Sequence, residues 1–176
     1  MKKGYALLFS VLVLIFSCSK KEEKNTKKSP AEIYQKEGVS FNLPAGWKVK
    51  QDYTRDEGRY LELDKYSNYK IESSLAIGIL KKAGSTDSIL DSQIKQLQFF
   101  YQKVTFNVLE EKKNTRLGKY NAITTTYEAD DTRNKVYGKI SVIQENDKTL
   151  FVQIVENKQN TDISDYNAIF NTFTIK

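Results

Sequence analysis

The side chains that most often carry enzyme chemistry are scarce in this sequence. It contains no histidine, and its single cysteine is Cys18. Histidine is the side chain whose ordinary pKa lies nearest neutrality, and it is the commonest zinc ligand. Its absence excludes a histidine-based catalytic triad, and the sequence has no nucleophile-elbow or P-loop spacing. The sequence therefore predicts no catalytic residue, no metal site, no cofactor and no enzyme activity.

Acidic residues occur as adjacent pairs, which is the remaining route to catalysis. From residue 37 onward the pairs are Asp56-Glu57, Glu110-Glu111 and Asp130-Asp131. A glycosidase needs two carboxyl groups that face each other about 5 to 9 Å apart, whereas neighbours on a strand point to opposite faces. Calcium takes about six to eight oxygen ligands, and no EF-hand-like loop is present. We expect solvated turn acids; the alternative is an envelope hydrolase or carbohydrate-active enzyme that uses carboxylates alone.

Tyrosine is concentrated in one stretch of the chain. Tyr53, Tyr60, Tyr66 and Tyr69 lie within 17 residues among arginines and lysines. Aromatic and arginine side chains dominate binding hot spots, but tyrosine is also a good strand residue. Core packing and a partner-binding surface are therefore both open interpretations. The same two interpretations apply to Phe99, which lies opposite the apolar stripe of a predicted helix.

The residues before Cys18 predict export and lipid attachment. Two lysines precede an apolar run from Ala6 to Phe16, and the small residue Ser17 comes directly before Cys18. This is the order of parts in an export signal. As a helix the run would span about 16 Å, too short for a hydrocarbon core of about 30 Å. The segment resembles a bacterial lipoprotein signal, in which the cysteine is acylated; the alternative is an ordinary secretory signal with an incidental cysteine.

The residues after Cys18 suggest a destination. Ser19 rather than aspartate follows the cysteine, which resembles lipoproteins sent to the outer membrane. Lys21-Glu22-Glu23 is similar to a short surface-export tag, so the periplasmic face and the cell surface are both open. Several acyl chains make membrane anchoring effectively permanent. We expect the membrane to be one partner, through Cys18, and an envelope protein or glycan to be another.

Charge divides the chain into three parts. Residues 1–17 form the predicted signal, and residues 18–36 form a lipidated N-terminus and flexible tether with six lysines and three glutamates. The tether is nearly devoid of apolar side chains and cannot offset the entropy of ordering. Residues 37–176 hold 20 basic and 19 acidic residues and have the size of one domain. Because this domain is nearly neutral, nucleic acid is not an expected partner.

Hydrophobic periodicity predicts the elements of the domain. Alternation and turn signals favour four strands before any strong helix and four after it: 39–43, 47–49, 59–64, 71–80, 106–117, 120–129, 135–144 and 149–157. Between the two groups, apolar residues at spacings of three and four predict a long amphipathic helix over 88–104. A shorter helix is predicted over 164–171. Short links imply antiparallel neighbours.

Two phrases at the ends of the domain resemble a known family. The run from Gly38 to Trp47 is similar to the opening of PsbP-like proteins, the superfamily of the photosystem II extrinsic protein P and a Ran-binding nuclear import factor. The run from Ile169 to Phe173 resembles their closing helix. The resemblance implies an α/β/α sandwich used mostly for binding, and some members are small bacterial lipoproteins. It transfers no functional residue, because the matching residues shape a turn and fill the core.

These observations lead to one expected architecture and one leading function. We expect an α+β fold, an α/β/α sandwich with one mainly antiparallel sheet covered by the long middle helix and the short C-terminal helix. We expect a membrane-anchored envelope lipoprotein that acts as a non-enzymatic binding or accessory module. A role as an assembly factor of a larger complex is not separable from this function by sequence.

Overall fold

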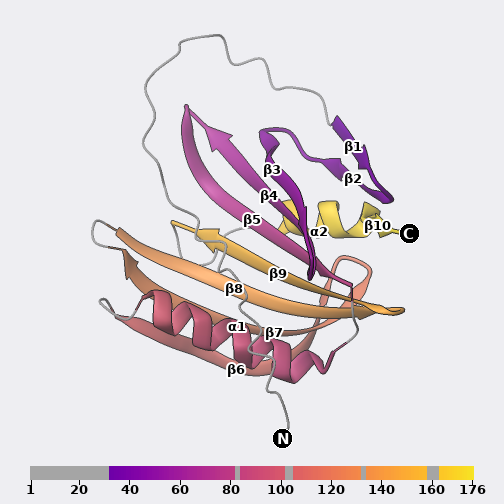
Figure 1. Ribbon diagram of the computed structural model, residues 1–176. Coiled ribbons are helices and arrows are strands. Elements are labelled where there is room, and N and C mark those ends of the chain that lie inside the picture. Colours follow the sequence, from indigo (N-terminus) through magenta and orange to yellow (C-terminus); the bar gives the residue numbers. More distant parts are fainter. Residues whose placement is uncertain (1–31, 82–83, 102–104, 132–133, 158–162) are drawn as a thin grey trace, which may run out of the picture.

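The computed structural model describes residues 32–81, 84–101, 105–131, 134–157 and 163–176 (Figure 1). Of the described residues, 65% lie in strands and 18% in helices. The helices are α1 (Thr86–Phe100) and α2 (Ser164–Thr172). The strands, in chain order, are β1 (Glu32–Lys36), β2 (Val39–Leu43), β3 (Trp47–Arg55), β4 (Gly58–Ser67), β5 (Lys70–Leu80), β6 (Phe106–Leu117), β7 (Tyr120–Asp131), β8 (Asn134–Glu145), β9 (Lys148–Glu156) and β10 (Thr174–Ile175).

Seven strands form the large sheet, in the order β3-β4-β5-β9-β8-β7-β6. Every neighbouring pair is antiparallel. After β5 the chain passes through α1 to the far edge of the sheet. It then returns strand by strand from β6 to β9, which pairs with β5. The edges of the sheet are therefore β3 and β6.

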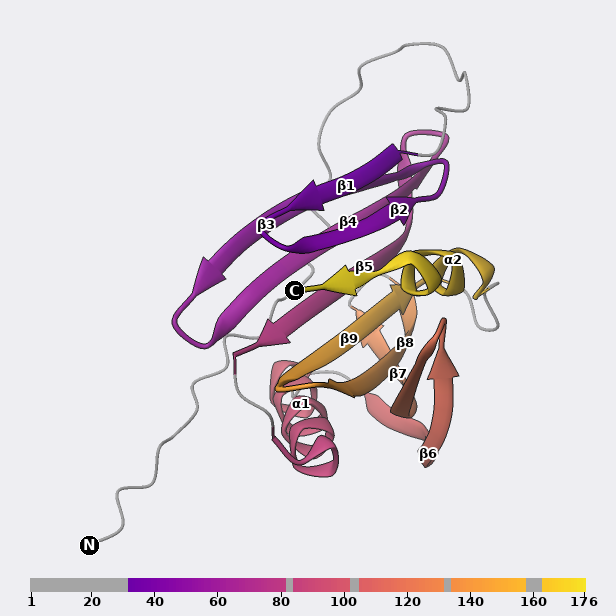
Figure 2. The same cartoon turned by 90° about the vertical axis from the view of Figure 1, so that its right-hand side faces the viewer.

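Helix α1 covers part of one face of the large sheet, over β7, β8 and β9 (Figure 2). Its N-terminus is capped by the Ser85 hydroxyl, which accepts from the backbone N–H of Ser88 at 3.4 Å. Such a cap satisfies one of the backbone donors that a helix start leaves unpaired. Leu90 and Leu97, which belong to the apolar stripe predicted from the sequence, are buried in the core beneath the helix. The helix ends at Phe100 rather than at the predicted residue 104, and residues 102–104 lie outside the described part of the chain.

Two glycines let aromatic rings lie flat on this same face of the sheet. Gly138 pairs across the strands with Tyr127, and Gly78 pairs with Phe151. A Cβ atom at either glycine would lie 2.0 Å from its partner's ring. The missing side chain is thus what gives each ring room, a packing known as aromatic rescue of glycine in sheets.

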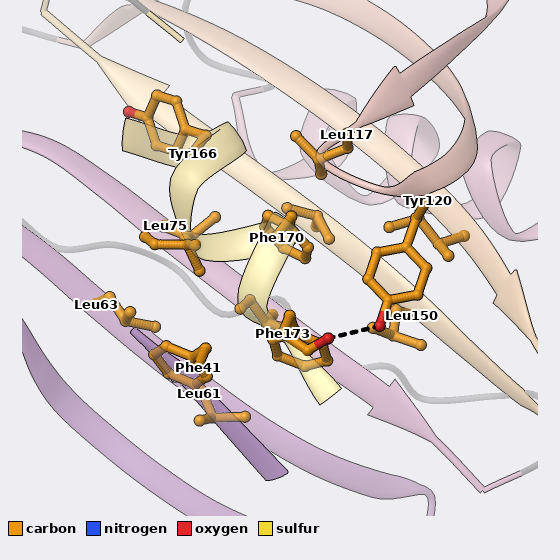
Figure 3. Close-up of a cluster of buried hydrophobic side chains, with 14 of the residues drawn as sticks. Phe41, Leu61, Leu63, Leu75, Leu117, Tyr120, Leu150, Tyr166, Phe170 and Phe173 are labelled. Atoms are coloured by element: carbon orange, nitrogen blue, oxygen red, sulfur yellow. Dashed lines mark hydrogen bonds between the residues drawn. The ribbon is translucent and has the colours of Figure 1, made fainter. Parts of the chain in front are cut away.

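The opposite face of the large sheet is covered by β1, β2, β10 and α2 (Figures 1 and 2). The three strands form a small antiparallel sheet in the order β1-β2-β10. Between the layers lies the larger core, drawn in Figure 3, where Phe41, Phe170 and Phe173 are almost fully buried. Phe173 stacks on Phe41 and Phe170, and its carbonyl accepts a 2.8 Å hydrogen bond from the Tyr120 hydroxyl.

The predicted α/β/α sandwich is therefore wrong. Strand dominates the fold, and one face of the large sheet carries a second sheet instead of a helical layer. The physical reason lies in β1 and β10. β1 is largely exposed and lacks the apolar alternation that marks a strand in sequence. Residues 173–175 are expected from the sequence to be a short extended segment, but the two residues of β10 are too few to predict that they pair with β2.

The small sheet is tied to the large one by a polar network around Asp52 on β3. The Arg59 guanidinium donates to both Asp52 carboxylate oxygens, from Nε at 2.8 Å and from Nη2 at 2.9 Å. The Tyr34 hydroxyl and the Lys36 ammonium, both on β1, donate to Asp52 at 2.6 and 2.7 Å. Residues 32–36, predicted as part of the tether, are thus a strand of the folded domain, which pairs with β2 and is tied to β3 by side-chain hydrogen bonds.

The network shifts the pKa values of Asp52 and Tyr34. The Arg59 hydrogen bonds hold the pKa of the Asp52 carboxyl well below its ordinary value, although burial opposes them, and the Lys36 and Tyr34 hydrogen bonds add to the effect. Burial, together with the hydrogen bond to Asp52, raises the pKa of Tyr34 to about 12. At neutral pH Asp52 is therefore ionised and Tyr34 keeps its proton.

We expect Asp52→Asn to destabilise the protein by about 3 kcal/mol at neutral pH, because it leaves the buried Arg59 charge without its carboxylate. A carboxyl with a depressed folded-state pKa stabilises the fold above its unfolded pKa of about 3.9 and loses that contribution as the pH falls below it. The wild type should therefore lose more stability than Asp52→Asn on acidification. Urea unfolding at pH values above and below about 4 measures both effects. The exposed turn variant Asp56→Asn is the control, and equal acid sensitivity of Asp52→Asn and the wild type would contradict this account.

Candidate functional site

An extra residue in β3 decides which side chains meet on each face of the β3–β4 hairpin. The pairing with β4 shifts between Val49 and Gln51, so that Lys50 forms a β-bulge. Up to the bulge, Val49 faces the larger core, and beyond it Asp52 takes the same side. Because strand side chains alternate, a regular strand would have put Asp52 on the opposite face. The bulge also leaves Lys50 and Tyr53 together on the α1 side of the sheet.

We call this side of the hairpin the hairpin face, and it consists of Lys50, Tyr53, Tyr60, Glu62, Asp64 and Tyr66. On β4 its residues alternate with Leu61 and Leu63, which belong to the larger core. Among the described elements, α1 packs on β7, β8 and β9, so the hairpin face lies on the half of the sheet away from that helix (Figure 2). Charged and aromatic groups therefore gather on a rigid strand pair outside the footprint of α1.

A lysine and two acids form the charged half of the hairpin face. The Lys50 ammonium lies 3.0 Å from Glu62 Oε1 and 3.6 Å from Asp64 Oδ2. Both acidic side chains are buried, with exposed fractions of 4% and 0%, whereas Lys50 is 35% exposed. Ser74 on β5 donates to Asp64 Oδ1 at 2.6 Å, and the Tyr66 hydroxyl lies 3.4 Å from Asp64 Oδ2. The cluster thus combines two neighbouring acids with one partly accessible cation.

Electrostatics keep the titratable donors of this cluster protonated at neutral pH. Burial lowers the pKa of Lys50, but the hydrogen bond to Glu62 and the charges of Asp64 and Glu62 outweigh it, so the pKa is raised overall. Burial, followed by the charge of Asp64, raises the pKa of Tyr66. Lys50 is accordingly a cation and Tyr66 a neutral donor.

Two stacked tyrosines form the aromatic half of the hairpin face. The rings of Tyr53 and Tyr60 lie 5.5 Å apart, and the Arg55 guanidinium lies over Tyr53 at 5.2 Å from the ring centre. Tyr60 is buried and contacts Phe151 at 6.3 Å, while Tyr53 is half-buried. Burial raises the pKa of both tyrosines. This half of the face is continuous with the core beneath α1.

The five aromatic residues proposed as a binding surface do not form one patch. Tyr53, Tyr60 and Tyr66 share the hairpin face, and Tyr69 lies at the adjacent β4–β5 turn with 63% of its surface exposed. Phe99 is 72% exposed but lies on α1, which packs on the other half of the sheet. The structure thus separates a tyrosine surface on the hairpin from an apolar surface on α1.

Sequence reasoning missed Lys50, Glu62 and Asp64. A usable signal was present for the acids, because Tyr60, Glu62, Asp64 and Tyr66 repeat every second residue and so share a strand face. No sequence signal marked Lys50, whose position depends on the bulge.

The adjacent acidic pairs of the domain are not part of the hairpin face. Asp56, Glu57, Glu110 and Glu111 are exposed, and Asp130 is half-buried. Within the described residues no group of three or more His, Cys, Asp or Glu side chains could hold a metal ion. Residues 1–31, and with them the predicted signal and Cys18, fall outside the described part of the chain. No helix in the described ranges is long and apolar enough to cross a membrane.

Comparison with solved structures defines the fold class. Cyanobacterial PsbP (CyanoP) from Synechocystis sp. PCC 6803 aligns with a TM-score of 0.57 and 12% identity, covering 90% of this chain and 98% of that one. A protein from Bacteroides thetaiotaomicron VPI-5482 aligns with a TM-score of 0.52 and 9% identity over 79% of this chain. This chain spans only 45% of the length of the Bacteroides protein.

The chain therefore has a PsbP-like fold, which confirms the resemblance found in its two end phrases. No protein-family model matches the sequence, and no curated protein matches it significantly. At such low identity the structural likeness shows the fold alone.

We expect Lys50→Met to destabilise the protein by about 2 kcal/mol, because Glu62 and Asp64 would be left buried without a cation. The loss should be smaller than the roughly 3–5 kcal/mol typical of a fully buried pair, since water screens the partly exposed Lys50. Urea unfolding at neutral pH measures it. Lys48→Met on the same strand is the matched control, because Lys48 is exposed and lies over the Tyr66 ring. Equal effects of the two substitutions would show that the cluster has no special electrostatic role.

Proposed function

We propose that this protein is an exported lipoprotein, anchored to the outer membrane through acylated Cys18, and that its domain is a non-enzymatic binding or accessory module. The support for the anchor is the order of a basic start, a short apolar run and a small residue before the only cysteine. The first described strand starts at Glu32, and 13 residues of the sequence lie between it and Cys18. Such an arrangement leaves a whole domain free to engage a partner near the membrane.

The proposed contact surface is the hairpin face together with the β4–β5 turn that carries Tyr69. The observation that supports this assignment is that the Lys50–Glu62–Asp64 cluster lies beside accessible tyrosines. Tyr66 is 39% exposed, and the Lys48 ammonium lies 5.9 Å from the centre of its ring. Tyrosine combines a flat apolar face with a hydroxyl group, and the lysines add donors. This chemistry fits a partner that presents both ring or apolar surface and hydrogen-bonding groups, as an envelope protein or a glycan does.

A hydrolase that uses carboxylates alone is the competing function. Glu62 and Asp64 are its best candidates, because they are buried neighbours on one strand face. Both, however, are within reach of the same ammonium, and Asp64 also accepts from Ser74. Because both carboxylates already have partners within the protein, a structural role in the hairpin fits them better than catalysis. Loss of a glycan-cleaving activity in Glu62→Gln would favour the hydrolase.

Anchoring predicts that Cys18→Ser abolishes acylation. Cells given radiolabelled palmitate should label the wild-type protein, which should sediment with outer membranes, whereas Cys18→Ser should carry no label and leave the membrane fraction or stay unprocessed. Ser19→Ala is the control, because it keeps the cysteine. A Cys18→Ser protein that still takes up label and stays in membranes would overturn the assignment.

A photo-crosslinking residue tests the contact surface in intact envelopes. Placed at Tyr66, it should give discrete crosslinked species, with protein partners identified by mass spectrometry and glycan partners by a mobility shift on glycosidase digestion. The control position is Asn171, which is exposed on α2 across the large sheet. The proposal fails if Tyr66 gives no crosslink or if both positions give the same set.

A further inference from the structure

The turn between β4 and β5 holds a tyrosine in a backbone conformation that favours glycine. Ser67 pairs with Lys70, so Asn68 and Tyr69 are the two turn residues, and their φ angles are +47° and +64°. Two-residue hairpin turns with positive φ at both positions prefer the sequence Asn-Gly. Asparagine tolerates this conformation, whereas a bulky residue in it is an outlier, and such backbone strain gathers at functional sites. The strain therefore indicates a function of the Tyr69 ring beyond forming the turn.

The Tyr69 ring belongs to a surface that presents rings beside hydrogen-bond donors. We call Lys48, Lys50, Tyr66 and Tyr69 the turn end of the hairpin. Tyr69 and Tyr66 are 63% and 39% exposed, and the exposed Lys48 holds its ammonium 5.9 Å from the centre of the Tyr66 ring. An ammonium has three donors, and the two acids beside Lys50 leave it capacity for a further acceptor. The turn end thus combines flat aromatic surface with hydrogen-bond donors.

The charges at the turn end are balanced within the protein. Lys50 lies against Glu62 and Asp64, and Asp64 is also the residue opposite Lys48 in the pairing of β3 with β4. Two cations therefore stand beside two anions, and the start of β5 adds one lysine and one glutamate. A strongly charged partner is drawn to a surface with an excess of the opposite charge. The turn end has no such excess, so an uncharged partner rich in hydroxyl groups fits it better.

The size of the turn end favours a glycan over a protein. A stable protein interface buries about 800 Å² on each partner, involves roughly 20–30 residues a side and has an apolar core. The turn end has four residues, and the large apolar groups that it exposes are the rings of Tyr66 and Tyr69. A sugar ring has a flat face of C–H groups and hydroxyls around its edge. It needs only an aromatic face and a few donors, which the turn end supplies.

The spacing of these groups implies an extended ligand. Glu62, which contacts Lys50, lies five residues before Ser67, the last residue of β4 ahead of the turn. At about 3.3 Å per residue this is a distance of roughly 17 Å along the strand. A single sugar cannot reach from Lys50 to Tyr69, whereas a chain of several sugars lying along β4 can.

We propose that the turn end binds a neutral oligosaccharide chain. The Tyr69 ring stacks on one sugar, and Lys48 and Lys50 donate hydrogen bonds to hydroxyl groups of the sugars beside it. This inference rests on the proposed contact surface and narrows its partner from an envelope protein or a glycan to an uncharged glycan; it does not depend on the lipid anchor. A ring that is already fixed in its bound position loses less conformational entropy on binding, which gives the strained turn its function.

Retention of the full-length protein, in mild detergent, on immobilised ligands tests the partner class. The ligands are neutral oligosaccharides of glucose, galactose, mannose and N-acetylglucosamine, the acidic glycan oligogalacturonate, and a polyglutamate peptide. We expect at least one neutral oligosaccharide to retain the wild type at both low and high salt, because salt screens only interactions between charges. The two acidic ligands should not retain it better than the neutral ones.

Substitutions separate binding by the turn end from a structural role. Tyr69→Gly should weaken retention about tenfold, yet it should not lower the free energy of unfolding in urea, because glycine adopts positive φ without strain. Asn146→Gly is its control, since Asn146 lies in the β8–β9 turn with a φ of +54°. Lys48→Gln should weaken retention about fivefold. Its control is Lys119→Gln, because Lys119 lies over the ring of Tyr120 at 5.2 Å.

Three results would overturn the proposal. The first is that no neutral oligosaccharide retains the protein, or that Tyr69→Gly is retained as well as the wild type. The second is retention by the acidic ligands alone, lost at high salt, which would indicate an acidic partner. The third is a lower free energy of unfolding for Tyr69→Gly, which would make its ring structural. Protein crosslinks at Tyr66 in intact envelopes, without retention on glycans, would keep the contact surface and refute only the glycan.

Discussion

The bulge at Lys50 is the constraint on which the two faces of the hairpin depend. A strand has a side-chain period of two, so one extra residue exchanges the faces of everything that follows it. Because of this exchange, Asp52 reaches Arg59 and the first strand of the small sheet, and Tyr53 reaches Tyr60 on the other side. Without it, the small sheet would lose its ionic attachment and the hairpin face its stacked tyrosines.

The hairpin carries buried ionic groups on both faces, which is unusual for an edge of a sheet. Buried charges are rarely the most stabilising choice, since apolar replacements of similar volume are often as good or better. A buried charge without its partner costs a large free energy, however, and a shifted register would leave at least one of these charges unpaired. We infer that Arg59 with Asp52, and Lys50 with Glu62 and Asp64, select a single register for β3 against β4. The same pairing that fixes the register also displays Lys50 and Tyr66 at the surface.

Local pattern was sufficient to predict most elements but not how they are layered. The strands from β6 to β9 and both helices carry strong periodicity and clear turn signals, and they form within two residues of their predicted bounds, except that α1 ends four residues early. β1 is largely exposed and β10 has only two residues, so local pattern says little about their pairing with β2. The bulge has no local signature either, so the position of Lys50 beside Glu62 and Asp64 could not be predicted, although the alternation of the two acids with Tyr60 and Tyr66 was visible in the sequence. Periodicity reports which face of an element is apolar, whereas pairing and register depend on residues far away in the sequence.

The hairpin face and the exposed rings at the end of α1 differ in the interactions that each can make. The hairpin face combines buried charges with hydrogen bonds, so its specificity depends on the position of individual polar atoms. Phe99 and Phe100 offer exposed apolar rings, which favour contact with any apolar surface over water but discriminate little else. A partner that is selected by polar chemistry is therefore expected at the hairpin and not at the end of α1.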